Sequence, residues 1–180
     1  MRILADETVG LIIDMQERLY PHIADHDELT RRTGILIEGL KAIDIKILVT
    51  EQYTKGLGFT IAPLREMLQE IEFVEKQAFS CCDEPAFFEQ LSQVNPRYVI
   101  VAGIEAHVCV LQTCIDLIGN GYHPVVVEDC VASRNPNDKK IAIRRMQQEG
   151  ALITTSESIL FELLRHSGTE EFKKISKLVK

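Results

Sequence analysis

The sequence predicts an α/β fold in which a parallel sheet is covered by helices on both faces. Six short apolar segments, rich in valine and isoleucine, alternate with longer segments whose apolar residues recur at helical spacing. Strands and helices that alternate in this way form right-handed βαβ units. No internal repeat, low-complexity segment or linker divides the chain, so residues 1–180 are expected to form one domain.

Each strand candidate is a short apolar run that stops at a polar side chain or a glycine. The first run stops at Asp14, the third at Lys76, and the fourth at Gly103, shortly before Cys109. The six candidates are 9–13, 45–50, 72–75, 98–102, 124–128 and 151–154.

The helix candidates carry the usual start and stop residues. Asp83 is placed to cap a helix with Pro85 in its first turn, and Asn135 opens another helix. Gly119 ends the helix that begins around Cys109. The remaining candidates are 27–43, 63–70, 157–166 and 170–180.

Three reactive side chains follow strands that should end at the same edge of the sheet. Open parallel sheets bind ligands beyond the carboxyl ends of their strands, where Asp14, Lys76 and Cys109 would meet. At a helix start, free backbone N–H groups and the helix dipole favour a thiolate at Cys109. The set predicts covalent catalysis in which Asp14 takes the thiol proton, Cys109 attacks and Lys76 orients the carboxylate. Singly, each residue also suits a structural role, as a buried thiol, a turn cap or a surface lysine.

Composition narrows the partners and the compartment. A net charge of −7 argues against a nucleic-acid partner, because phosphate binding needs a positive surface. The chain has no long apolar run and no secretion-signal pattern at its start, which predicts a cytoplasmic protein without a membrane partner. The five cysteines include no CxxC pair, so free thiols are expected.

Three stretches of the chain carry a resemblance to a known superfamily: LIIDMQ around Asp14, VEKQAFS around Lys76 and VAGIEAHVCVLQT around Cys109. In this order, they resemble the isochorismatase-like, or cysteine hydrolase, superfamily along nearly the whole chain. The forms GIEAHVCV and VTEQYTKGLG look most like its isochorismatase domain-containing and YcaC-type branch. The resemblance implies a three-layer, doubly wound, Rossmann-like fold with six parallel strands, and assembly as a homo-oligomer.

For the site, the resemblance implies a catalytic triad of Asp14, Lys76 and Cys109. It also implies an oxyanion hole formed by the backbone N–H groups of Glu105 and Cys109, with a non-proline cis peptide bond between Ile104 and Glu105. True isochorismatases lack the nucleophilic cysteine. Its presence here therefore points away from vinyl-ether cleavage and toward hydrolysis of an amide or related C–N bond in a small molecule.

One departure from the superfamily concerns metals. Its nicotinamidases carry an aspartate and a histidine as metal ligands after the second strand, where this chain has Glu51, Gln52 and Tyr53. The imidazole is lost and no histidine cluster replaces it, so neither a metal nor another cofactor is expected.

Four residues near the strand ends are candidates for lining the substrate pocket: Gln16, Tyr20, Tyr53 and Phe79. Aromatic rings there can stack on a flat ligand, although Phe79 is equally suited to a core position. Two other functions stay open. One is a non-catalytic scaffold or thiol-redox protein that uses the same cysteine; the other, opposed by the acidic composition, is a ribonuclease.

Overall fold

A six-stranded sheet runs through the computed structural model, which describes residues 2–180. Neighbouring strands are all parallel and follow the order β3-β2-β1-β4-β5-β6. The predicted α/β class and the parallel six-stranded sheet are therefore confirmed. The strands are β1 (Thr8–Ile13), β2 (Ile47–Gln52), β3 (Phe73–Lys76), β4 (Tyr98–Ile104), β5 (His123–Ala132) and β6 (Leu152–Thr154).

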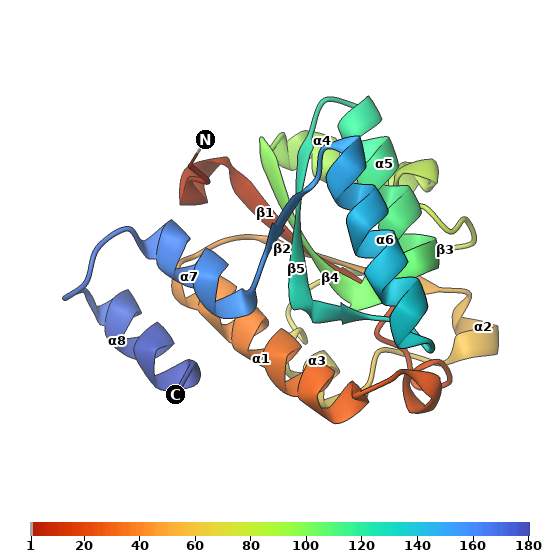
Figure 1. Ribbon diagram of the computed structural model, residues 1–180, viewed down its shortest axis with the longest axis horizontal. Helices are drawn as coiled ribbons and strands as arrows, with labels where there is room; N and C mark the ends of the chain where they lie inside the picture. The colour runs from red at the N-terminus through yellow and green to blue at the C-terminus, as the bar shows by residue number, and fades with distance from the viewer. Residues whose placement is uncertain (1) are drawn as a thin grey trace.

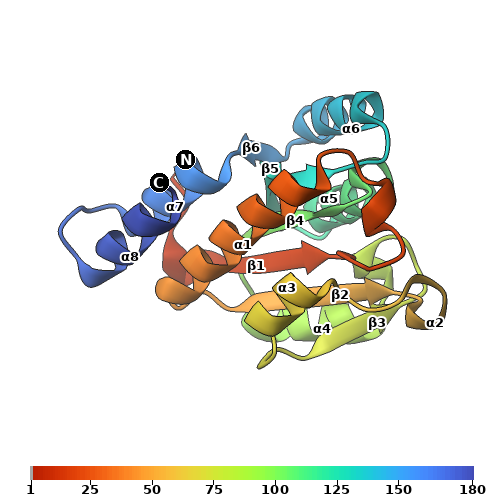
Figure 2. The same ribbon diagram turned by 90° about the horizontal axis from the view of Figure 1, so that it is seen from below.

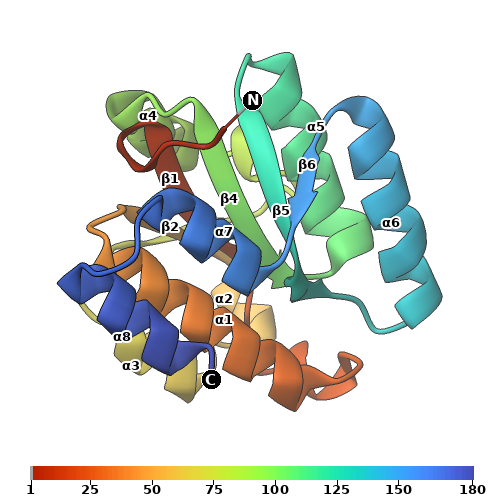
Figure 3. The ribbon, with the colours of Figure 1, turned by 60° about the vertical axis from the view of Figure 1, so that its left-hand side comes forward.

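Helices cover both faces of this sheet, which gives the molecule three layers (Figure 1). On one side lie α1, α3, α7 and α8, and on the other side lie α4, α5 and α6 (Figure 2). Figure 3 shows α8 against α1 and α7, away from the sheet. The helices are α1 (His26–Ala42), α2 (Thr54–Leu57), α3 (Ala62–Met67), α4 (Pro85–Val94), α5 (Leu111–Gly119), α6 (Pro136–Glu149), α7 (Ser156–Leu164) and α8 (Glu170–Leu178).

The central strand β1 contributes to two apolar cores. Successive side chains of a strand point to opposite faces of the sheet. Val9, Leu11 and Ile13 accordingly pack on the side of α4, α5 and α6, whereas Ile12 packs on the side of α1. Every residue of β1 is buried, as expected for a parallel strand between two helical layers. None of the helices within residues 2–180 is long and apolar enough to cross a membrane.

The end of β4 differs from its predicted form. The strand does not stop at Gly103 but continues to Ile104, because the apolar run itself continues. Gly103 is needed for close packing instead, since a Cβ atom added there would lie 2.3 Å from the carbonyl oxygen of Ile13. The chain then forms a π-helical turn, Ala106–Val110, before α5 begins.

The strand order changes direction between β1 and β4. From β1 the chain builds outward to β2 and β3, and then returns to the other side of β1 to add β4, β5 and β6. The carboxyl edge of the sheet at such a switch point is where α/β folds bind ligands. Asp14 directly follows β1 and Cys109 lies beyond β4, so both residues stand at this point.

Candidate active site

The structure brings Asp14, Lys76 and Cys109 together beyond the carboxyl ends of β1, β3 and β4. The Nζ atom of Lys76 lies 2.7 Å from Oδ2 of Asp14, and both side chains are at most 1% exposed. Cys109 is buried in the π-helical turn, close enough to Asp14 for the charge of that carboxylate to raise the pKa of its thiol. A buried ion pair and a thiol thus share one carboxylate.

The Asp14 carboxylate is fixed by donors on both oxygens. Thr50 lies near the carboxyl end of β2, and its hydroxyl donates to Oδ1 over 2.9 Å. Lys76 donates to Oδ2. The backbone of Asp14 is left-handed, with φ of 54°, a conformation that aspartate tolerates better than most residues. The carboxylate is therefore oriented before any substrate binds.

The ammonium group of Lys76 has an oxygen acceptor available for each of its N–H donors. Its Nζ lies within hydrogen-bond distance of four oxygens: Asp14 Oδ2 at 2.7 Å, Gln52 Oε1 at 2.7 Å, Ala78 O at 3.2 Å and Phe79 O at 3.1 Å. Burial is the largest single influence and lowers the pKa of Lys76, but the negative charge of Asp14, the two neighbouring cysteines and the hydrogen bond to Asp14 together raise the pKa above its ordinary value. The group is a fixed positive charge, not a snorkelling surface lysine.

The protonation of Cys109 corrects the expectation of a thiolate. Burial raises the pKa of the Cys109 thiol, and the charge of Asp14 raises it further. The positive charge of Lys76 lowers this pKa, but by less than the other two effects raise it. Cys109 is therefore a neutral thiol at neutral pH. The helix-terminus effect that suggested a thiolate is outweighed because the cysteine is only 6% exposed and faces a carboxylate.

The predicted cis peptide bond between Ile104 and Glu105 is wrong. Residues 2–180 contain no cis peptide bond, and the chain instead turns after β4 through the left-handed backbone of Glu105, with φ of 55° and ψ of 58°. The Glu105 carboxylate is held by Nε of Arg134 at 2.5 Å, and Nδ1 of His107 lies 3.4 Å away. The same His107 nitrogen lies 2.9 Å from the Ser133 hydroxyl oxygen, so His107 lines the turn.

Two of the four pocket candidates serve the scaffold. The fully buried Gln16 donates to the carbonyl oxygens of Gln52 and Gly58, at 2.9 and 2.7 Å, and accepts from the Gln52 amide at 2.7 Å. The Tyr20 hydroxyl donates to the His26 carbonyl oxygen and accepts from Thr30. The Gln16 side chain braces the loop after β2, and Tyr20 braces the start of α1.

The other two candidates contact Lys76 through their backbone groups. The Tyr53 amide donates to the Lys76 carbonyl oxygen, and the Phe79 carbonyl oxygen accepts from Lys76 Nζ. Both rings are exposed, Tyr53 by 47% and Phe79 by 56%, which excludes Phe79 from the core. Phe59, which sequence reasoning missed, is also exposed, by 52%, in the loop that follows α2.

Thr50, Gln52 and Cys81 are further residues at the site that sequence reasoning missed. Thr50 donates a hydrogen bond to Asp14, Lys76 donates one to Gln52, and the Cys81 thiol contacts the Thr50 hydroxyl. Their position in the sequence could have identified Thr50 and Gln52. Both lie at the carboxyl end of β2, which is next to β1, so they stand at the same edge of the sheet as Asp14.

The segment that corresponds to the metal ligands of nicotinamidases, Glu51 to Tyr53, makes other contacts in this structure. The buried Glu51 accepts from the Thr60 amide at 2.7 Å and pairs with Arg65 at 2.7 Å. Within the described residues 2–180, no group of three or more histidine, cysteine, aspartate or glutamate side chains is arranged to hold a metal ion.

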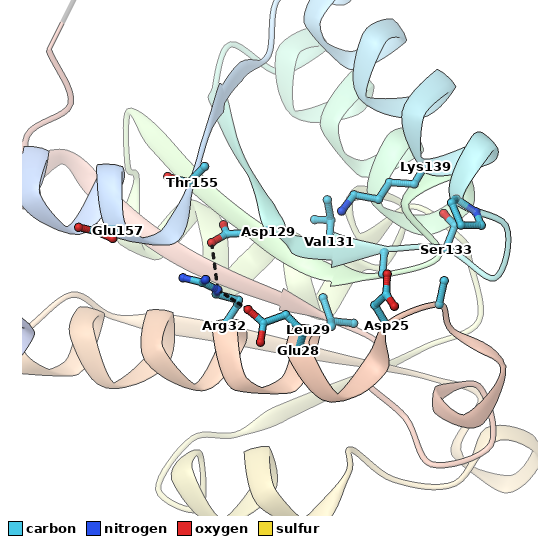
Figure 4. Close-up of a pocket in the computed structure, with 13 residues that line it drawn as sticks. Asp25, Glu28, Leu29, Arg32, Asp129, Val131, Ser133, Lys139, Thr155 and Glu157 are labelled. Carbon is cyan, nitrogen blue, oxygen red and sulfur yellow. Dashed lines mark hydrogen bonds and ion pairs between the residues drawn. The ribbon is translucent and has the colours of Figure 1, made fainter. Parts of the chain in front are cut away.

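A separate cavity of about 560 Å³ opens between the starts of α1, α6 and α7 (Figure 4). The triad residues are not among those that line it. Glu28 in its wall has its pKa lowered to about 2, mainly by hydrogen bonds from Arg31 and Arg32. Asp129 accepts from both the amide and the hydroxyl of Ser156, at 2.7 and 2.6 Å. These charges are already partnered within the wall.

Comparison with known proteins identifies related chains. The isochorismatase domain family model matches residues 8–158. Mouse isochorismatase domain-containing protein 2A is 35% identical over 180 residues, covering 99% of this chain and 85% of its own. The structure of MAR1 ribonuclease from Caenorhabditis elegans has a TM-score of 0.94 at 37% identity, covering 99% and 92% of the two chains.

A more distant structure shares the fold. The YcaC gene product of Escherichia coli, described as an octameric hydrolase of unknown specificity, has a TM-score of 0.93 at 21% identity. The match covers 99% of this chain and 89% of the YcaC chain.

Proposed function

This chain belongs to the isochorismatase domain family, and from that premise we propose that it is a hydrolase that cleaves a C–N bond of a small molecule through Cys109. The observation that carries the proposal is the shared carboxylate of Asp14. One oxygen is paired with the buried ammonium of Lys76, and the same carboxylate lies close enough to the Cys109 thiol for its charge to raise the thiol pKa.

In the first half-reaction, Asp14 acts as a general base. It takes the Cys109 proton as the sulfur attacks the carbonyl carbon of an amide, so that a thiolate forms only when substrate is present. The tetrahedral intermediate then collapses, the C–N bond breaks, and the departing nitrogen receives the proton from Asp14. A thioester on Cys109 and a free amine or ammonia result.

In the second half-reaction, water replaces the amine. Asp14 accepts a proton from the water, which attacks the thioester, and the Cys109 sulfur leaves with that proton as the acid product departs. Lys76 takes no part in proton transfer, because its three N–H groups already face four oxygens. Its role is to hold Asp14 and to supply positive charge.

The oxyanion that develops on the substrate needs donors beside the nucleophile. We assign this role to the backbone N–H groups of Glu105 and Cys109, which belong to the turn that follows β4. The backbone groups of Tyr53 and Phe79 contact Lys76, and their exposed rings are our candidates for stacking on a flat substrate group.

The test is a panel of small primary amides, including nicotinamide, with ammonia release as the readout. The wild-type chain is expected to hydrolyse at least one member and to form a covalent adduct on Cys109. Cys109→Ala should lower the rate by on the order of 10⁵-fold, and Asp14→Asn by about 10⁴-fold, as for other nucleophile and carboxylate replacements. Hydrolysis that survives Cys109→Ala would overturn the proposal.

A ribonuclease activity is the second candidate, because it is the activity named for the C. elegans neighbour. The net charge of −7 and the neutral thiol of Cys109 give little support for phosphodiester cleavage. Labelled RNA belongs in the same panel. RNA cleavage that is abolished by Cys109→Ala, without amide turnover, would replace the amidase proposal.

A further inference from the structure

A second thiol, that of Cys81, is connected to the Asp14 carboxylate through the Thr50 hydroxyl. The Sγ atom of the fully buried Cys81 lies 3.6 Å from the Thr50 hydroxyl oxygen, and that hydroxyl donates to Asp14 Oδ1 over 2.9 Å. The Thr50 proton is committed to Asp14, so the Cys81 thiol is the donor toward Thr50. A hydrogen-bonded path therefore runs from Cys81 through Thr50 to the base that also serves Cys109.

The position of Cys81 relative to Cys109 follows from a second contact. The Cys81 amide donates to the Thr113 hydroxyl over 3.0 Å. Thr113 lies four residues after Cys109 in the continuous stretch formed by the π-helical turn and α5, and residues four apart share a face. Both cysteines belong to the same buried apolar cluster. They approach Asp14 from neighbouring positions.

The electrostatic setting is common to the two thiols. Burial raises the pKa of Cys81 to about 11, the charge of Asp14 raises it too, and Lys76 lowers it, as for Cys109. Each cysteine is therefore a neutral thiol in the resting protein. Asp14 is the base proposed for Cys109, and Thr50 connects Cys81 to the same carboxylate.

From this juxtaposition we propose that Cys81 is the resolving thiol for oxidised Cys109, so that peroxide converts the site into a reversible disulfide. The inference rests on the proposed function only in using Asp14 as the base for Cys109. It assigns Cys81 a chemical role that packing alone does not require.

The chemistry balances with hydrogen peroxide as the oxidant. The Cys109 sulfur attacks one peroxide oxygen, the O–O bond breaks, and the thiol proton leaves with the other oxygen as water, which gives a sulfenic acid. The Cys81 sulfur then attacks the Cys109 sulfur, and its proton passes through Thr50 and Asp14 to the departing hydroxide. One disulfide and a second water result, and two equivalents of an external thiol restore the site.

Such a disulfide would protect the nucleophile. A sulfenic acid that meets no thiol proceeds to sulfinic acid, which is irreversible in most proteins. Cys81 opens the 3₁₀ turn Cys81–Asp83, so its backbone belongs to a short connecting turn rather than to the sheet. A disulfide requires the two Cα atoms to lie about 5.5–6 Å apart, and we expect any adjustment to take place in this turn.

The test compares the wild-type chain with Cys81→Ala and with Cys114→Ala, a matched removal of another fully buried thiol from the same cluster. Each protein is treated with hydrogen peroxide, blocked with N-ethylmaleimide and mapped by peptide mass spectrometry. The wild type and Cys114→Ala should yield a Cys81–Cys109 linked peptide that dithiothreitol releases. Cys81→Ala should instead give dimedone-reactive Cys109 and then its sulfinic acid. If the alanine variant does not fold, Cys81→Ser takes its place.

The outcomes separate this inference from the proposed function. Equal sulfinic acid formation at Cys109 in the wild type and Cys81→Ala, or a link to a different cysteine, overturns the role of Cys81. If amide hydrolysis then still depends on Cys109, the proposed function stands without it. If peroxide produces the Cys81–Cys109 link but the reduced protein hydrolyses no amide, the resolving role is supported and the hydrolase proposal is removed.

Discussion

At the catalytic cysteine, burial and the charge of Asp14 act in the same direction. Both raise the pKa of the Cys109 thiol, and the positive charge of Lys76 offsets only part of the effect. A neutral nucleophile needs a nearby base, and Asp14 is the carboxylate whose charge acts on this thiol. The arrangement favours a thiolate that is made during the reaction over one that exists beforehand.

This electrostatic balance predicts opposite effects of Asp14→Asn on two reactions of the same sulfur. Loss of the negative charge lowers the Cys109 pKa, so at a fixed pH near 8 more thiolate is present and alkylation by iodoacetamide becomes faster. The gain is about tenfold for each unit by which the pKa falls. Amide hydrolysis falls instead, because the base is lost. Labelling is measured against pH by peptide mass spectrometry.

Lys76→Met provides the reversed control for that experiment. Removal of the positive charge raises the Cys109 pKa, so labelling at the same pH should slow. The fully buried Cys114 should stay unlabelled in every variant. Slower labelling of Cys109 in Asp14→Asn would show that the carboxylate does not raise the thiol pKa, and would contradict the assigned contact.

Between elements, Gln16 connects β1 to the segments that follow β2. The amide group of the buried Gln16 contacts three partly buried backbone groups, two on Gln52 and one on Gly58. Gln16→Met keeps the size of the side chain and leaves these groups without partners. We expect the free energy of unfolding to fall by about 2–4 kcal/mol, since each buried unpaired group costs about 1–3 kcal/mol. Urea unfolding measures the change.

The matched control for Gln16→Met is Gln148→Met, on the exposed side of α6. It should change the free energy of unfolding by less than about 0.5 kcal/mol. Equal stability of the two variants would show that Gln16 does not brace the loop. The residue would then return to the list of pocket candidates.

The close approach of β4 to β1 depends on Gly103. A Cβ atom at this position would lie 2.3 Å from the Ile13 carbonyl oxygen, and its φ of 147° is rare for other residues. Gly103→Ala should therefore lower the free energy of unfolding by at least about 3 kcal/mol or prevent folding. The control is Gly119→Ala at the end of α5, where nothing lies within 4 Å of the added atom. Thermal unfolding of the two proteins gives the comparison.

The elements themselves could be predicted because periodicity is local. Alternating apolar runs located all six strands within a few residues, and the strand ends placed Asp14, Lys76 and Cys109 at one edge. Local patterns do not contain the contacts across strands that orient Lys76 through Gln52 or Asp14 through Thr50. The protonation of Cys109 was missed for the same reason, because it depends on burial and on a charge brought close by folding.

For the whole molecule, the exposed aromatic side chains are unevenly placed. Tyr53, Phe59 and Phe79 are between 47% and 56% exposed, and all three lie in segments that follow β2 or β3 at the carboxyl edge. Large aromatic rings lose favourable burial when they stay in water, and they are enriched at protein interfaces. The edge of the sheet that carries the triad is therefore a candidate contact surface.

We expect the protein to form a homo-oligomer, because three exposed aromatic rings at this edge favour contact with a second chain. Light scattering at micromolar concentration should give a mass that is a multiple of the 20.4 kDa chain. Phe59→Ser with Phe79→Ser should reduce that mass if these rings lie in the contact, whereas Ile141→Ser, which changes an exposed residue on α6, should leave it unchanged. A wild-type mass of one chain would contradict the assembly. Loss of amide hydrolysis together with loss of mass would show that a neighbouring chain helps to complete the substrate pocket.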